Sequence, residues 1–145
     1  LTGYTDDAIR AKMKRGVWRE RNRQLVIGNP PGKVKQVSLQ AFAAVPDPRK
    51  PVDILSTLAG VGPATSSAVL ARYSPAVYPF FDELVAAQIP ELGKAAFTAA
   101  YYQRYAAALR ERAARLNEQC DHREWSAHDV SQALWAQSGG KAAHA

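Results

Sequence analysis

The sequence predicts an all-α protein, a small bundle of about seven helices. Alanine is abundant, the alternation of β-branched residues typical of strands is absent, and proline, glycine and helix-capping residues divide the chain into segments. With 145 residues, of which 47% are hydrophobic, the chain is long enough to bury an ordinary core. We therefore expect one helical domain over residues 1–138 and a flexible tail over residues 139–145.

Three helices are expected before residue 45. The first is capped by Thr5 and ended by Gly16, the second covers 17–27 and stops at the sequence GNPPG, and the third covers 33–44. In the third helix, four apolar side chains are available for the core: Val34, Val37, Leu39 and Phe42.

The remaining helices follow in order. Two short helices begin at Pro51 and Pro63, because proline is tolerated in a first helical turn, and another begins at Asp82. The segment 94–119 predicts the longest helix, and Ser126 can cap a last helix over 127–137. The apolar residues expected to face the core from these helices are Leu55, Leu58, Val69, Leu70, Phe97, Tyr101, Tyr105, Leu109, Leu116, Val130, Leu134 and Trp135.

Positive charge is concentrated near the start of the chain. The net charge is +6, yet residues 10–35 contain nine basic residues and one acidic residue, so the rest of the chain is slightly acidic. A concentrated basic patch is typical of proteins that contact phosphates, and the alternative is a solvated helix face. The basic residues are Arg10, Lys12, Lys14, Arg15, Arg19, Arg21, Arg23, Lys33 and Lys35.

The cysteine content excludes several kinds of site. With Cys120 alone, the chain can form no internal disulfide and no cysteine-based zinc or iron–sulfur site, which fits a reducing intracellular compartment. Cys120, His122 and His128 are irregularly spaced, so we expect surface loop residues rather than metal ligands. No apolar run reaches the length of about 18 residues that a membrane helix needs, and no membrane partner is expected.

A tight turn at LAGVGPAT, residues 58–65, joins the two short helices. Gly60 and Gly62 supply the backbone angles that such a turn requires, and their missing side chains allow another backbone to approach closely. Backbone N–H groups at the start of the second helix then point outward beside the positive end of its dipole, which suits a phosphate. The alternative is a pair of helices joined only for packing.

These residues resemble the hairpin of helix-hairpin-helix DNA-binding proteins, with Leu58, Gly60, Val61, Gly62 and Thr65 matching the signature L-x-G-V-G-x-x-T. The resemblance implies a hairpin that grips one strand of duplex DNA through its phosphates. It allows a monovalent cation held by hairpin carbonyl groups, and no other cofactor is expected. The predicted DNA-binding residues are Gly60, Val61, Gly62, Ala64 and Thr65 from the hairpin, and Lys12, Lys14, Arg15, Arg19, Arg21 and Arg23 from the basic patch.

Residues 51–87 also resemble the DNA glycosylase (HhH-GPD) branch of this superfamily, in which a proline-containing loop leads to an essential Asp at a helix start. Asp82 follows such a loop, YSPAVYPFF, and the resemblance implies that it is catalytic. A fixed carboxylate stabilises the positive charge that develops on the sugar when an N-glycosidic bond breaks. Ala64 stands where lyase members carry a lysine, so the resemblance implies a monofunctional enzyme of base excision repair without a Schiff base.

Two features leave the activity open. The chain provides about half of the usual glycosylase scaffold, and Asp82 is also explained as an ordinary helix N-cap. The aromatic residues that could line a base pocket are Trp18, Tyr73, Tyr78, Phe80 and Phe81. We therefore expect DNA binding first, possible base excision second, and as alternatives a DNA-binding module that has lost the pocket or a scaffold for an acidic protein. The charge and the fold suggest a nuclear or nucleoid location.

Overall fold

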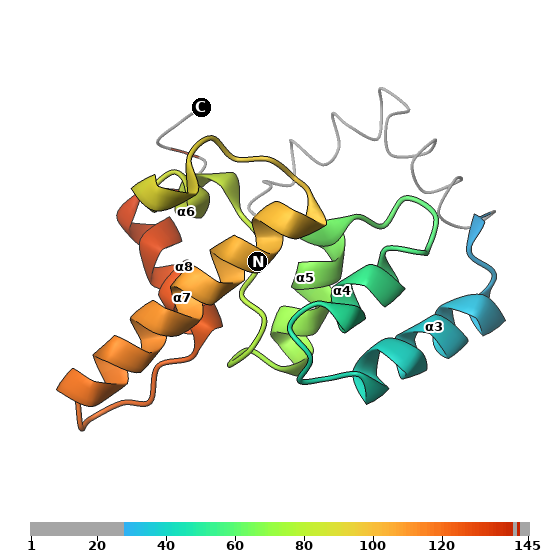
Figure 1. The fold of residues 1–145 in the computed structure, drawn as a ribbon, viewed down its shortest axis with the longest axis horizontal. Helices are drawn as coiled ribbons and strands as arrows, with labels where there is room; N and C mark the ends of the chain where they lie inside the picture. Colours follow the sequence, from blue (N-terminus) through green and yellow to red (C-terminus); the bar gives the residue numbers. More distant parts are fainter. Residues whose placement is uncertain (1–27, 141, 143–145) are drawn as a thin grey trace.

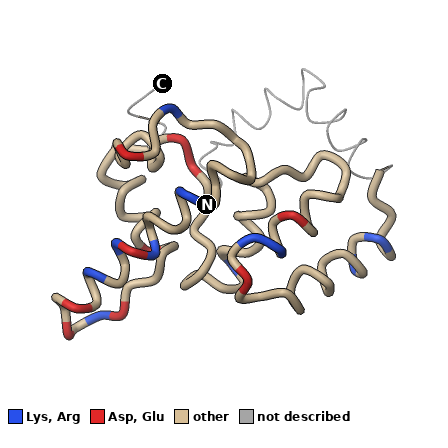
Figure 2. Tube along the Cα trace, viewed as in Figure 1, with Lys and Arg blue, Asp and Glu red and all other residues tan. Residues whose placement is uncertain are grey.

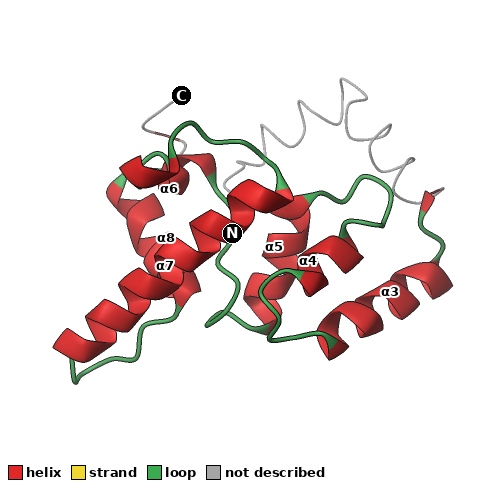
Figure 3. Ribbon diagram, in the orientation of Figure 1, coloured by secondary structure: helices red, strands yellow, loops and turns green. Residues whose placement is uncertain are grey.

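The structure is a computed structural model that describes residues 28–140 and 142 of the chain. Every regular element in these residues is a helix, which confirms the predicted all-α class (Figure 3). The helices predicted over 5–16 and 17–27 lie outside the described residues. Within the described part, each helix is too short or too polar to span a lipid bilayer. The elements are α3 (Pro31–Ala43), α4 (Lys50–Leu55), α5 (Pro63–Tyr73), α6 (Glu83–Ala86), the 3-10 helix η1 (Pro90–Leu92), α7 (Ala99–Gln119) and α8 (Ala127–Gln137).

The described helices form two groups connected by the loop 74–82. Helix α4 packs against α3 and α5, and helix α8 packs against α6 and α7. Figure 1 shows α3, α4 and α5 on one side of the molecule and α6, α7 and α8 on the other. The loop 74–82 leads from α5 to α6 and places Tyr78 and Phe81 in the core, where both side chains are fully buried.

An aromatic cluster forms the centre of the core. The ring centroid of Phe81 lies 5.7, 5.5 and 5.1 Å from the centroids of Tyr101, Tyr102 and Tyr105 in α7. Aromatic pairs at such distances attract each other beyond the effect of buried area alone. Tyr101, Tyr105 and Leu109 face the core as their helical spacing predicts, and Tyr102, outside the predicted stripe, is equally buried.

Capping side chains set where the last two helices begin. The hydroxyl of Thr98 accepts the N–H of Tyr101 at 3.2 Å, so α7 begins at residue 99 rather than at residue 94. Phe97 therefore precedes the helix and is 52% exposed, and its predicted place in the core is wrong. Ser126 caps α8 as predicted, in a reciprocal capping box with Asp129.

Three further apolar residues were expected in the core from their spacing and are exposed instead. Val34 and Leu39 are 37% and 59% exposed because α3 packs mainly on α4, with Ala41 as its one buried residue. Val69 is 42% exposed because α5 turns two buried serines, beside its leucine and alanine, toward the core. Trp135, a weaker expectation, is 37% exposed. Helical spacing shows which apolar residues share one face of a helix. It does not show whether another element covers that face.

Candidate nucleic-acid interface

The predicted turn joins α4 to α5 closely. Leu58 is buried, and its carbonyl accepts the N–H of Val61 at 3.1 Å, which closes the turn. Gly60 has a φ of 72°, a left-handed conformation that favours glycine. Gly62 has an extended backbone, and a Cβ added there would meet no atom of the described residues within 4 Å. The surface at Gly62 is therefore open to a ligand.

The first turn of α5 has backbone N–H groups that donate a hydrogen bond to no acceptor among the described residues. Gly62 precedes the helix without a side-chain cap, and its carbonyl accepts the N–H of Ser66 at 2.9 Å. Among the described residues, no acceptor bonds the N–H groups of Ala64 and Thr65. Because the positive end of the helix dipole lies here, the turn has the local chemistry of an anion site. The turn brings together the predicted hairpin residues Gly60, Val61, Gly62, Ala64 and Thr65.

The hairpin itself carries no ionisable charge. The sequence contains no acidic or basic residue between Asp53 and Arg72. Figure 2 shows charged residues elsewhere, including a cluster along the second half of α7 and the loop that follows. The described part of the basic patch consists of Lys33 and Lys35, both exposed in α3. The other predicted DNA-binding residues lie outside the described part of the chain: Lys12, Lys14, Arg15, Arg19, Arg21 and Arg23.

A side-chain amide ties the segment before α3 to the hairpin turn. Asn29 Nδ2 donates to the carbonyl of Ala59 at 2.8 Å, and Asn29 Oδ1 accepts the N–H of the same residue at 2.8 Å. Asn29 is 8% exposed, so water competes little for these bonds. A Cβ on Gly28 would lie 2.5 Å from the Cβ of Ala59, so the close approach requires glycine.

Asp82 caps α6, as its position in the sequence predicts. Its Oδ1 accepts the N–H groups of Leu84 at 2.8 Å and Val85 at 3.4 Å. The residue is 8% exposed. Asp82 Oδ2 makes no hydrogen bond to the described residues. It is also not one of their completely buried polar side-chain atoms that lack a hydrogen-bond partner. One carboxylate oxygen is therefore held by the helix, while the other has no hydrogen-bond partner among the described residues.

The backbone of Phe80, two residues before Asp82, is held on both sides. The hydroxyl of Tyr105 in α7 donates to the carbonyl of Phe80 at 2.6 Å. The N–H of Phe80 donates to Nδ1 of His128 in α8 at 3.3 Å. Side chains from two helices thus fix the approach to Asp82.

The protonation states of these partners suit their hydrogen bonds. Burial raises the pKa of Tyr105 above its usual range, a backbone hydrogen bond with Asp82 opposes the shift, and the negative charge of Asp82 adds to it. Burial lowers the pKa of His128, against the charge of Asp129. Tyr105 therefore remains a hydroxyl donor, and neutral His128 can accept at Nδ1.

Ser67 connects the first turn of α5 to the same loop. Its hydroxyl oxygen accepts the N–H of Phe81 at 2.9 Å, and its hydroxyl donates to the carbonyl of Ala64 at 2.7 Å. Ser67 is completely buried. Ser67 thus ties the first turn of α5 to the loop that leads into Asp82.

The aromatic residues considered for a base pocket do not converge. Tyr78 and Phe81 are buried in the core, whereas Tyr73 and Phe80 are 54% and 38% exposed. The ring of Tyr73 stacks on Phe42, with centroids 4.2 Å apart. Trp18 lies outside the described residues.

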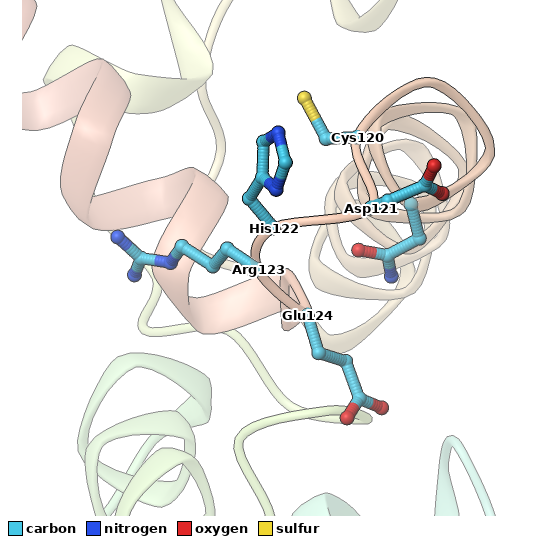
Figure 4. Close-up of a pocket in the computed structure, with 6 residues that line it drawn as sticks. Cys120, Asp121, His122, Arg123 and Glu124 are labelled. Atoms are coloured by element: carbon cyan, nitrogen blue, oxygen red, sulfur yellow. The ribbon is translucent and has the colours of Figure 1, made fainter.

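Asp82 lines neither of two hollows on the described part of the chain. One, of about 410 Å³, is an open hollow at the loop after α7, with Cys120 and His122 on its rim (Figure 4). Another, of about 400 Å³, lies between α7 and α8. His128 does not line the hollow that contains Cys120 and His122. It lies in the first turn of α8. Among the described residues, no group of three metal-ligating side chains comes together.

No protein-family model, curated protein or solved structure matches this chain. The interpretation of the candidate site therefore depends on the geometry of this chain alone. Asn29 and Ser67, the two side chains that hold the turn to its neighbours, were not predicted from the sequence. No local signal distinguished Asn29, because an Asn directly before prolines at the start of a helix is equally well explained as an ordinary helix cap.

Proposed function

We propose that this protein binds duplex DNA through the turn between α4 and α5, as the resemblance to helix-hairpin-helix proteins implies. The observation that supports the proposal is the first turn of α5, whose Ala64 and Thr65 amides have no acceptor among the described residues. Among the described residues, no side chain lies within 4 Å of a Cβ placed at Gly62, which leaves room on this side of the turn for a phosphate to approach the amides. Contacts of this kind fix position on the DNA without reading its sequence.

Most of the affinity would come from charge outside the hairpin. The turn offers backbone dipoles only, because residues 54–71 are uncharged. The basic residues between 10 and 35 supply the cations that replace counterions on the phosphates. Binding should therefore weaken steeply with salt.

A monovalent cation at the hairpin is compatible with the donors available. The turn offers neutral carbonyl oxygens and no carboxylate, a donor set too weak for a dedicated divalent site. The carbonyls of Leu58 and Ala59 already accept hydrogen bonds, and each has a second lone pair for a cation. Such a cation would link the turn to a phosphate oxygen.

Base excision is the second candidate function, and the geometry of Asp82 supports it. A carboxylate held by the N–H groups of α6 and open at Oδ2 could stabilise a sugar cation and orient a water. Ala64 offers no amine, so the reaction would be hydrolysis without a Schiff base. The scattered aromatic residues favour the rival proposal of a DNA-binding module without a base pocket.

Fluorescence anisotropy with three labelled duplexes at two salt concentrations would test both functions. The duplexes are undamaged, abasic, and substituted with a cationic mimic of the glycosylase transition state. Salt-dependent binding to all three supports DNA binding, and no binding at low salt would refute it and favour an acidic protein as partner.

The excision proposal needs a further comparison. It predicts tighter binding to the cationic mimic that is lost in Asp82→Asn, because asparagine keeps the helix cap but removes the charge. Asp121→Asn, an exposed change in the loop after α7, is the control. Equal binding of the three duplexes, or an unchanged preference in Asp82→Asn, would remove Asp82 from the mechanism.

A further inference from the structure

The segment before α3 meets the hairpin turn through contacts that are specific in both shape and hydrogen bonding. The amide of Asn29 satisfies the N–H and the carbonyl of Ala59 together, across 30 residues of sequence. Gly28 allows the contact because a Cβ there would lie 2.5 Å from the Cβ of Ala59. We call Gly28 and Asn29 with Ala59 the amide clamp.

The amide clamp lies between the uncharged hairpin turn and the lysines of α3. The hairpin has no charged residue, and the basic patch occupies the chain on both sides of Asn29. Lys33 and Lys35 follow the clamp directly, in the first turns of α3, and both are exposed. Four residues span at most about 14 Å, or about four base-pair steps of duplex, so Lys33 and the turn can reach the same stretch of one strand.

We propose that the amide clamp makes the hairpin turn and the lysines of α3 a single binding surface for the phosphate backbone of DNA, with Asn29 as its positioning residue. The inference rests on the proposed DNA binding and adds to it the residue that joins its two parts. Without the clamp, the lysines and the turn would bind phosphates as separate weak elements. With the clamp, the cost of aligning them is met during folding rather than during binding.

Asn117 provides a matched control for Asn29. Its Nδ2 donates to the carbonyl of Trp125 at 2.9 Å and its Oδ1 accepts the N–H of Trp125 at 2.6 Å, the same pair of bonds at the far end of α7. Asn29→Ala and Asn117→Ala therefore remove the same chemistry, one at the hairpin and one remote from it. Circular dichroism melting of both variants would establish that each is folded at the assay temperature.

The test measures binding of the 145-residue chain to a labelled undamaged duplex over a range of salt concentrations. We expect Asn29→Ala to weaken binding by about tenfold and Asn117→Ala by less than about twofold. The slope of log affinity against log salt should fall by up to about 1.8 in Asn29→Ala, the contribution of two lysine contacts. A general loss of folded protein would lower affinity without changing this slope.

A mutant cycle isolates the coupling between the clamp and the lysines. Lys33→Gln with Lys35→Gln should reduce the salt slope by up to about 1.8 in the wild-type background. The same pair of changes should have much less effect once Asn29 is alanine. Equal effects in the two backgrounds would overturn the inference while leaving DNA binding intact.

A second variant tests the clamp if Asn29→Ala does not fold. Gly28→Ala should push the segment away from Ala59 and lower the affinity and salt slope in the same way. Ala59→Gly in the same chain removes the clash and should restore both values. Failure of this rescue, or no effect of Gly28→Ala in a folded protein, would refute the clamp. If the wild-type protein binds no duplex, the proposed function itself fails, which is a different result.

Discussion

Replacing Ser67 with alanine should destabilise the protein by removing the bond between α5 and the loop 74–82. The serine is completely buried, accepts the N–H of Phe81 at 2.9 Å and donates to the carbonyl of Ala64 at 2.7 Å. In Ser67→Ala the N–H of Phe81 stays buried without this acceptor, which costs about 1–3 kcal/mol. The better helix propensity of alanine offsets up to about 0.5 kcal/mol. We expect the free energy of unfolding to fall by about 0.5–3 kcal/mol.

Ser131 in α8 is the matched control for this prediction. It is 3% exposed, and its hydroxyl donates to the carbonyl of His128, three residues earlier, at 2.7 Å. This repeats the bond from Ser67 to Ala64, and the hydroxyl oxygen also lies 3.4 Å from Nδ1 of His128, but among the described residues no backbone N–H donates to Ser131. Ser131→Ala should therefore cost about 1 kcal/mol or less.

Urea unfolding followed by circular dichroism would measure both losses. The difference between the two variants isolates the contribution of the Phe81 N–H bond and should be at least about 1 kcal/mol. Losses that agree within about 0.5 kcal/mol would refute the reasoning, because the orphaned N–H would then have found water or another acceptor.

Three other changes have expected outcomes. Burial lowers the pKa of His128 below 6.5, so the imidazole binds a proton more tightly in the unfolded chain than in the folded one. The free energy of unfolding should therefore be retained above about pH 6.5 and fall as the pH decreases through the folded-state pKa. Urea unfolding at high and low pH should show a smaller fall for His128→Gln, and an equal fall would contradict this. Gly60→Ala should lower the melting temperature, because the φ of 72° at this position is strained for alanine. Gly62→Ala should leave the melting temperature unchanged and weaken duplex binding measured by anisotropy. The reverse pattern would argue against the open turn. Tyr102→Phe removes the donor that lies 3.0 Å from the carbonyl of Pro79 and should cost about 1–2 kcal/mol on urea unfolding, unless water reaches that carbonyl.

Features encoded within a few residues could be predicted from the sequence. Asp82 and Ser126 begin helices because their side chains accept N–H groups two or three residues ahead, a bond that depends on local geometry alone. Gly60 likewise marks a backbone conformation that other residues rarely adopt. The all-α class follows from such local signals, while the DNA-binding and catalytic assignments stay predictions.

Which faces of the helices are buried was decided by tertiary packing. The same helical spacing places Tyr105 in the core and leaves Leu39 59% exposed, because the outcome depends on which neighbour covers each stripe. The bonds of Asn29 to Ala59 and of Ser67 to the loop 74–82 have the same origin, since they join residues far apart in the chain. The sequence alone determined the helical class, the caps at Asp82 and Ser126 and the glycine turn, because these are local. Only the folded structure decided how the turn is held against its neighbours, because that requires segments distant in sequence to meet in space.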